Sequence, residues 1–256
     1  MHFASPGPDP MAIVDDMERT GQWLFRWRGY LPLAVLGLSV IAVLVDHPRP
    51  GHAQARGAWE MVCLMISGVG LAFRVMTVGH APAGTSGRNA RRQVATTLNT
   101  TGMYSLLRHP LYLGNFFLML GVVLFAKTLW LTIWYALSFW IYYERIMAAE
   151  EAFLRRQFGP AFESWSRAVP AFVPRFSGWI APSLSFSIRN VLRREYNGFF
   201  AIFLSMFILD VARNAAWNGH VAADSRWLFL LGTATAIWLV LRSLKRHTTA
   251  LRVSVR

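Results

Sequence analysis

The sequence predicts an all-α integral membrane protein with about six transmembrane helices. Of its 256 residues, 54% are hydrophobic and 15% are charged, whereas roughly a quarter of the residues in a soluble domain are charged. Eleven Trp and 18 Phe require burial, which excludes a disordered chain. No segment has the pattern of a strand. The single cysteine, Cys63, excludes an internal disulfide and a multi-cysteine metal site, and no metal is expected.

Six long apolar runs supply the expected spans. They are 30–45, 58–78, 111–126, 128–143, 198–212 and 227–241. A spanning helix needs about 20 mostly apolar residues, with a range of roughly 17–25, so the shorter runs must be completed by flanking residues. Only Lys127 separates the third run from the fourth, which predicts a tight helical hairpin. Residues 1–20 lack the apolar core of a signal peptide, so the first span is expected to remain as an anchor.

The segments between these runs are expected to be irregular. Pro6, Pro8 and Pro10 predict an irregular start to the chain. The segment 79–97, rich in Gly, Ser and Thr, reads as a loop. Three prolines in 170–190 predict an irregular interfacial stretch with short helical pieces.

The net charge of +13 is interpreted as an orientation signal and not as a nucleic-acid-binding surface. With six spans, 20 of the 26 Lys and Arg residues lie on the side of the termini and the two long loops, and five lie on the other. Positive residues accumulate in cytoplasmic loops. Both termini and both long loops are therefore expected in the cytoplasm.

Charged side chains within the runs are few, and they are Glu60, Arg74 and Asp210. Intramembrane charges mark function by default. All three lie near the ends of their expected spans, however, where a side chain reaches the interface easily. Snorkelling to the membrane surface is therefore the simpler explanation for this group.

The first polar block, 102–114, precedes and opens the third run. Pro110 suits the first position of a helix, where its missing N–H has no cost. Arg108 and His109 come directly before it, and the helix N-terminus offers N–H groups and a positive dipole end to a carboxylate or phosphate. Alone, the block is equally consistent with a charged anchor beside an aromatic belt of Tyr104 and Tyr112.

The second block, 144–159, follows the fourth run and has apolar residues at spacings of three, four and seven, which predicts an amphipathic helix. Glu151 and Arg155 form an i,i+4 pair typical of a solvated face. Glu150 stands between that face and the apolar stripe, where its carboxylate has access to a cationic or hydroxyl-bearing ligand.

Together the two blocks are more specific. Arg-His-Pro-x-Tyr-x-Gly before the hairpin and Glu-Arg-x-x-x-x-Glu-Glu-x-x-Leu-x-x-x-Phe-Gly after it resemble the membrane methyltransferase family of isoprenylcysteine carboxyl methyltransferase and phosphatidylethanolamine N-methyltransferase. The trailing run 169–174 is also similar, although Phe162 and Trp165 stand where Tyr is common. The resemblance covers roughly 60–175. Gly68-Val69-Gly70 resembles a Gly-x-Gly of the phospholipid branch, but helix packing explains it more simply.

The resemblance implies an S-adenosylmethionine-dependent enzyme with its cofactor pocket at the cytoplasmic face. It divides the chain into an N-terminal arm with the first span (1–57), a methyltransferase core of three spans and the Glu-Glu helix (58–176), and a connector with two further spans (177–256). The residues it implies for the cofactor site are Arg108, His109, Pro110, Tyr112, Gly114, Glu150 and Glu151. Arg108, His109 and Glu144 are the expected catalytic groups.

The expected acceptor is an anionic oxygen, a carboxylate or phosphate, on a membrane lipid or lipidated substrate. Such an oxygen needs no general base, whereas an ammonium must first lose a proton. Arginines near the site, which favour anions, are Arg145, Arg175, Arg193 and Arg194. The run 84–102 resembles bacterial members, some of which methylate a lipid A phosphate, and points to a bacterial inner membrane. N-methylation of an amino phospholipid and a non-catalytic scaffold or carrier remain alternatives.

Overall fold

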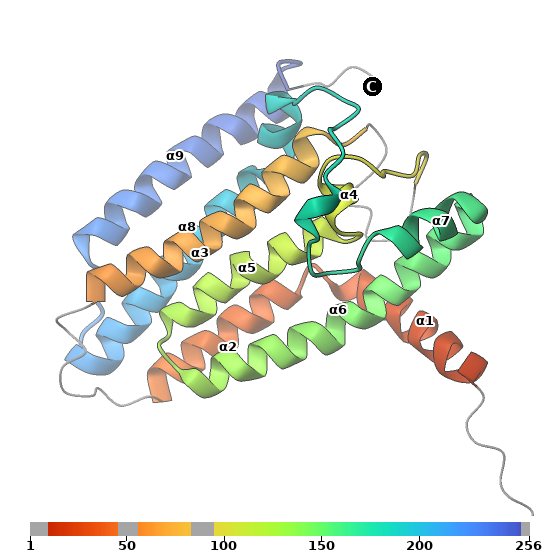
Figure 1. Cartoon of the computed structure of the whole chain (residues 1–256). Helices are drawn as coiled ribbons and strands as arrows, with labels where there is room; N and C mark the ends of the chain where they lie inside the picture. Colours follow the sequence, from red (N-terminus) through yellow and green to blue (C-terminus); the bar gives the residue numbers. More distant parts are fainter. Residues whose placement is uncertain (1–9, 46–55, 83–94, 252–256) are drawn as a thin grey trace, which may run out of the picture.

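The computed structural model describes residues 10–45, 56–82 and 95–251, and these form a bundle of helices without strands (Figure 1). The expected all-α class is confirmed. The helices are α1 Pro10–Trp27, α2 Leu31–Val45, α3 Arg56–Gly79, α4 Met103–Leu106, α5 Pro110–Phe125, α6 Leu129–Phe158, α7 Pro160–Ala168, α8 Ile188–Asn218 and α9 Ser225–His247, with a short 3-10 turn, η1, at Phe176–Gly178.

Each of the six apolar runs lies on one of these helices, but six spans are not confirmed. Within the described residues, α3, α8 and α9 are long and apolar enough to cross a membrane. The pair α1 and α2 adds a fourth span if it counts as one, although it is bent by 74°. Helix α5 has only 16 residues, which is below the usual length of a span. The fold fits an integral membrane protein with three or four such helices.

Two local expectations differ from the structure because the helices extend further than the apolar runs. The fourth run and the Glu-Glu helix are a single 30-residue helix, α6. Pro6 and Pro8 lie outside the described residues, but the chain is helical from Pro10, which is tolerated in the first turn of a helix. Helix α1 packs on α6 through Gly21, where a side chain would overlap the carbonyl group of Arg145. The tight hairpin at Lys127 and the irregular stretch 170–187 are confirmed.

Helix α5 lies at the centre of the bundle, against α3, α6, α2 and α8, and its closest neighbour is α3. Glycines make that approach possible. A side chain at Gly70 would overlap the backbone of Leu118 and Gly114, and one at Gly121 would overlap Ser67 and Cys63. Ser67 also donates a 2.9 Å hydrogen bond to the Leu118 carbonyl oxygen. The packing interpretation therefore holds for Gly70.

A matched pair of glycines tests this packing. We expect Gly70→Ala to destabilise the fold by about 1–3 kcal/mol, the usual cost of overpacking, because two helix backbones must separate. Gly68→Ala is the control, since nothing lies within 4 Å of its added methyl group. Thermal unfolding in detergent measures both. Equal midpoints for the two variants would contradict a role for Gly70 in helix contact.

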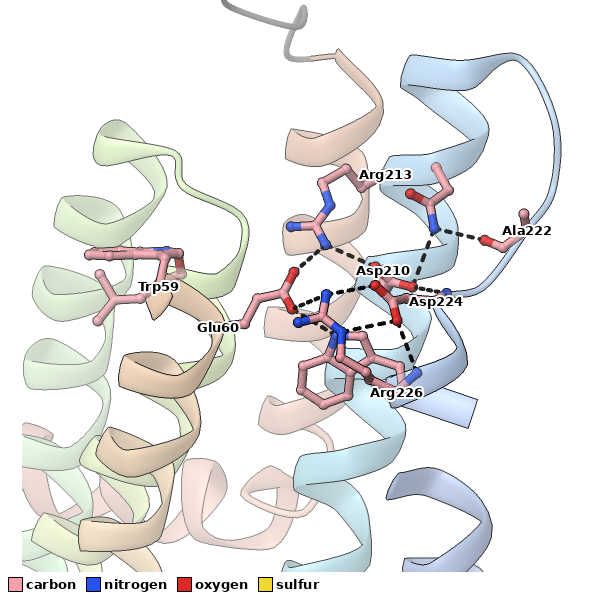
Figure 2. Close-up of polar contacts among 10 residues, drawn as sticks. Trp59, Glu60, Asp210, Arg213, Ala222, Asp224 and Arg226 are labelled. Atoms are coloured by element: carbon pink, nitrogen blue, oxygen red, sulfur yellow. Dashed lines mark hydrogen bonds and ion pairs between the residues drawn. The ribbon is translucent and has the colours of Figure 1, made fainter. Parts of the chain in front are cut away.

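The snorkelling explanation is wrong for the intramembrane charges, which face the interior of the bundle. Figure 2 shows Glu60 of α3 beside Asp210 and Arg213 of α8. Arg213 lies 2.7 Å from Glu60 and 2.9 Å from Asp210, and all three side chains are buried. Arg74, with 16% of its side chain exposed, is paired with the buried carboxylate of Glu195. These charged side chains therefore form ion pairs inside the protein and do not reach out to the membrane interface.

Candidate active site

The Arg-His-Pro segment is an extended stretch that is held in place by the chain after α7. The backbone N–H of Arg108 donates to the Pro170 carbonyl oxygen at 2.9 Å, and that of His109 donates to Ala171 at 3.2 Å. The Arg108 guanidinium donates to the carbonyl oxygens of Ser166 and Val169. The run 169–174 therefore supports the motif that it accompanies in the sequence.

The two glutamates of α6 face this segment. The Nε2–H of His109 donates to Glu151 Oε1 at 2.9 Å, and its Nδ1 lies 3.6 Å from Glu150 Oε2. The Tyr112 hydroxyl donates to Glu150 Oε2 at 2.7 Å. Arg108 Nε forms an ion pair with Glu151 Oε1 at 2.8 Å, although its N–H is not aligned for a hydrogen bond. The hairpin thus brings the two sequence blocks together.

Aromatic rings connect this cluster to a second set of polar side chains. The rings of His109 and Tyr112 are stacked with centroids 5.5 Å apart, and Tyr143 lies 4.8 Å from Tyr112. Asn115 donates to the Tyr143 hydroxyl at 3.2 Å and accepts from Arg74 Nη1 at 2.5 Å. The network links the Glu-Glu end of α6 with α3.

The charges of the cluster reinforce one another. Burial disfavours the imidazolium form of His109, but the hydrogen bonds and charges of Glu150 and Glu151 outweigh burial and raise the pKa of His109. Burial also disfavours both carboxylates, yet His109, with Tyr112 for Glu150 and Arg108 for Glu151, lowers their pKa. The protonated form of His109 and the ionised forms of the two glutamates therefore stabilise one another.

The pH dependence of stability follows from these pKa directions. The raised pKa of His109 stabilises the fold fully below the unfolded value of 6.5, and this contribution is lost as pH rises through the folded value. The glutamates contribute above 4.5, and their contribution is lost as pH falls through their lowered values. We expect the unfolding midpoint of the wild type to fall more steeply with pH above 6.5 than that of His109→Gln. Parallel pH profiles would contradict a charged His109.

The cluster opens on a cavity of about 420 Å³, within the range of roughly 300–1,000 Å³ that small-molecule sites occupy. Its walls come from the α1–α2 connection, α3, the loop before α4, α5, α6, α7 and α8. The polar and aromatic side chains that line it are Phe25, Arg28, Arg74, Thr97, Asn99, Tyr104, Arg108, His109, Tyr112, Asn115, Tyr143, Glu150, Phe153 and Trp165. Glu150 keeps 34% of its side chain exposed whereas His109 keeps 4%, so the free carboxylate edge at the cavity is that of Glu150.

Most of the expected cofactor residues meet at this cavity. Arg108, His109, Pro110, Tyr112 and Glu150 line it, and Glu151 holds Arg108 and His109 from behind. Gly114 does not line it. Instead, a side chain there would overlap Arg74 and the Gly70 carbonyl oxygen, so this glycine allows α3 to approach.

The other expected residues lie elsewhere. Glu144 is exposed on α6 and outside the cavity lining, because six residues along a helix are one and two-thirds turns from Glu150. None of the four expected substrate arginines lines the cavity. Arg145 reaches its own helix at Ile141, Arg175 reaches Ala168, and the Arg193 carbonyl oxygen accepts from Lys245. Arg194 lies on α8, also outside the lining. The run 84–89 lies outside the described residues.

Two arginines and a tryptophan are among the lining residues that the sequence analysis did not assign to the site. Arg28 comes from the α1–α2 connection, Arg74 from α3 and Trp165 from α7. Arg74 was visible as an intramembrane charge, and Trp165 as part of the family pattern. No sequence pattern indicated that Arg28 lies at the cavity, because only the packing of α1 on α6 brings it there.

Comparison with known proteins finds one matching family and several similar proteins. Residues 61–161 match the phospholipid methyltransferase family. The nickel-cobalt-cadmium resistance protein NccN of Alcaligenes xylosoxydans xylosoxydans is 29% identical over 84% of this chain and 93% of its own length. The cobalt-zinc-cadmium resistance protein CzcN of Cupriavidus metallidurans is 36% identical over 50% of this chain and 56% of its own.

An enzyme is also among the relatives. The protein-S-isoprenylcysteine O-methyltransferase of Schizosaccharomyces pombe is 31% identical over 33% of this chain and 36% of its own length. No solved structure matches the chain significantly.

Proposed function

Since residues 61–161 carry the family match, this chain belongs to the isoprenylcysteine and phospholipid methyltransferase family, and we propose that it is an S-adenosylmethionine-dependent enzyme that methylates an anionic oxygen on a membrane lipid or lipidated substrate. The observation that carries the proposal is the Arg108–His109–Glu150–Glu151 cluster at the mouth of a cavity of about 420 Å³. The family's two motifs meet there.

The chemistry of the cavity fits the cofactor. S-adenosylmethionine combines a sulfonium and an ammonium with a carboxylate and an adenine ring. The exposed edge of Glu150 offers a carboxylate to the cationic part. Arg108, which lines the same wall, suits the carboxylate. Tyr104, Phe153 and Trp165 offer aromatic surface to the adenine ring.

When bound, the cofactor supplies a methyl group whose bond to sulfur breaks as a bond to the acceptor oxygen forms, the electron pair staying on the sulfur of S-adenosylhomocysteine. The protein's part in such a displacement is positioning and exclusion of water. Glu151 fixes Arg108 and His109, and His109 and Tyr112 fix Glu150. The cluster is thus preorganised before any ligand arrives.

The same geometry favours an anionic oxygen over an amine. An ammonium acceptor needs a base to remove its proton. The raised pKa of His109, caused by Glu150 and Glu151, favours the protonated imidazole over the free base, and Glu144 lies outside the cavity lining. The cavity lining also contains the positively charged side chains of Arg28 and Arg74. We therefore assign the acceptor end of the cavity to the side of Arg74.

The membrane setting follows from charge and composition. The 20-to-5 asymmetry of basic residues favours an inner membrane in which the cavity end of the bundle faces the cytoplasm, where S-adenosylmethionine is made. On this view α5 and α6 complete a bundle of six membrane helices, although they are short or rich in aromatic residues.

The test uses the purified protein in vesicles and S-adenosylmethionine labelled in its methyl group. The vesicles contain S-farnesylcysteine, phosphatidic acid or phosphatidylethanolamine, which offer a carboxylate, a phosphate and an amine. Label in either of the first two supports the proposal, and a carboxyl methyl ester is released by base. Base-stable label confined to phosphatidylethanolamine would favour N-methylation. Absence of both label and cofactor binding would favour a scaffold or carrier.

A further inference from the structure

Arg74, at the inner wall of the cavity, is anchored by a residue from the C-terminal part of the chain. Its Nε and Nη2 donate to the two carboxylate oxygens of Glu195 at 2.7 and 2.9 Å, and its Nη1 donates to Asn115. The Glu195 side chain is 5% exposed and the Arg74 side chain 16%. A two-point contact of this kind fixes the plane of the guanidinium.

Glu195 belongs to α8, which lies beyond the family match at 61–161. Gly198, one turn further along the same face of α8, lines the cavity, and so does Ala201. A side chain on Gly198 would be in ordinary contact with Glu195, 3.6 Å from its Oε2. Helix α8 therefore builds one wall of the cavity, although it is not part of the matched family segment.

The other end of α8 is also fixed to α3 by an ion pair, but here α8 supplies the cation and α3 the anion. Arg213 of α8 lies between Glu60 of α3 and Asp210 (Figure 2). Trp227 of α9 donates to Glu60 at 3.1 Å, and the backbone N–H of Asp224 donates to Asp210 at 2.9 Å. We call this group the Glu60 cluster.

The two anchors together determine how α8 lies on α3. Glu60 and Arg74 are 14 residues apart on α3, or about 21 Å along a helix. In the Glu60 cluster the cation, Arg213, comes from α8. In the other pair the cation, Arg74, comes from α3. Two such points resist both sliding and rotation of α8, because either movement separates buried charges.

We propose that Glu195 is a positioning residue of the active site, and that α8 is thereby a functional part of the enzyme rather than an appended membrane anchor. By holding Arg74, Glu195 aims the guanidinium at the anionic group of the acceptor. Three of the five N–H groups of Arg74 have partners among the described residues, and the guanidinium keeps contact with the cavity. The inference rests on the proposed function for the identity of the acceptor.

Exchanging the charges of Arg74 and Glu195 tests whether Glu195 positions Arg74 for the acceptor or only stabilises the fold. Glu195→Ala should raise the KM for the anionic acceptor about tenfold and leave the Kd of S-adenosylmethionine within about twofold. The double variant Arg74→Glu with Glu195→Arg should restore the unfolding midpoint but not the KM, because the cation then comes from α8. Restoration of both would reduce the pair to a structural ion pair and overturn the proposal. Arg226→Met is the control, expected to leave both the midpoint and the KM nearly unchanged, because its side chain is 58% exposed.

A binding measurement keeps this test independent of catalysis. S-farnesylcysteine and phosphatidic acid, added in detergent, should raise the unfolding midpoint of the wild type more than S-farnesylcysteine methyl ester, which lacks the carboxylate. Glu195→Ala should lose that difference. An unchanged difference in Glu195→Ala would overturn the inference whether or not methyl transfer occurs. Loss of the difference in a protein that transfers no methyl group would contradict only the proposed function.

Discussion

Glu150→Gln is expected to weaken S-adenosylmethionine binding about 10- to 100-fold and to reduce methyl transfer by at least as much. The substitution preserves size but removes the negative charge at the cavity, where Glu150 is the carboxylate with an exposed edge. A hydrogen bond to a charged group contributes about 1.5–3 kcal/mol, which corresponds to that range of affinity. Isothermal calorimetry and transfer of labelled methyl groups measure the two effects.

Glu144→Gln is the matched control, because it removes the same charge from the same helix six residues away. Glu144 is exposed and outside the cavity lining. We expect its affinity for S-adenosylmethionine to remain within about twofold of the wild type. If Glu144→Gln impaired binding as strongly as Glu150→Gln, the cofactor would lie on a different face of α6 from the one described.

Arg213→Met is expected to destabilise the fold by about 3–5 kcal/mol, the cost of removing one partner from a buried ion pair. Met retains much of the volume of Arg, so the lost charge dominates. The substitution leaves Glu60 and Asp210 buried near one another without Arg213 between them. Thermal or denaturant unfolding in detergent measures the change.

Arg226→Met provides the comparison within the same region. Arg226 pairs with Asp224 at 2.6 Å, but its side chain is 58% exposed, and exposed pairs contribute about 0–1 kcal/mol. We expect a small shift in the unfolding midpoint. Equal losses for Arg213→Met and Arg226→Met would contradict the assignment of the Glu60 cluster to the bundle interior.

The wall of the cavity that carries the Arg-His-Pro segment and Glu150 could be predicted from sequence because its residues are local to one hairpin. Arg108, His109 and Tyr112 come just before and within α5, and the glutamates follow on α6. Both groups lie about 15–25 residues from the same turn at Lys127, and antiparallel helices bring such positions side by side. Motif and topology therefore agree.

The Arg74–Glu195 and Glu60–Arg213 pairs could not be predicted, because each joins distant parts of the chain. Arg74 and Glu195 are 121 residues apart, and Glu60 and Arg213 are 153 apart. No spacing rule links such residues, so each charge looked like a surface group near the end of its span. The four expected arginines do not line the cavity for a related reason: a loop rich in Arg gives a charge density but not a direction for each side chain.

The most direct test of the central claim is ultraviolet crosslinking of labelled S-adenosylmethionine to the wild-type protein, followed by mass spectrometry of the labelled peptides. We predict label at the cavity, on the segments 104–112, 150–154 or at Trp165, and its loss when excess S-adenosylhomocysteine competes. Label on α9, or no label that the competitor removes, would contradict a cofactor site between the Arg-His-Pro segment and the two glutamates.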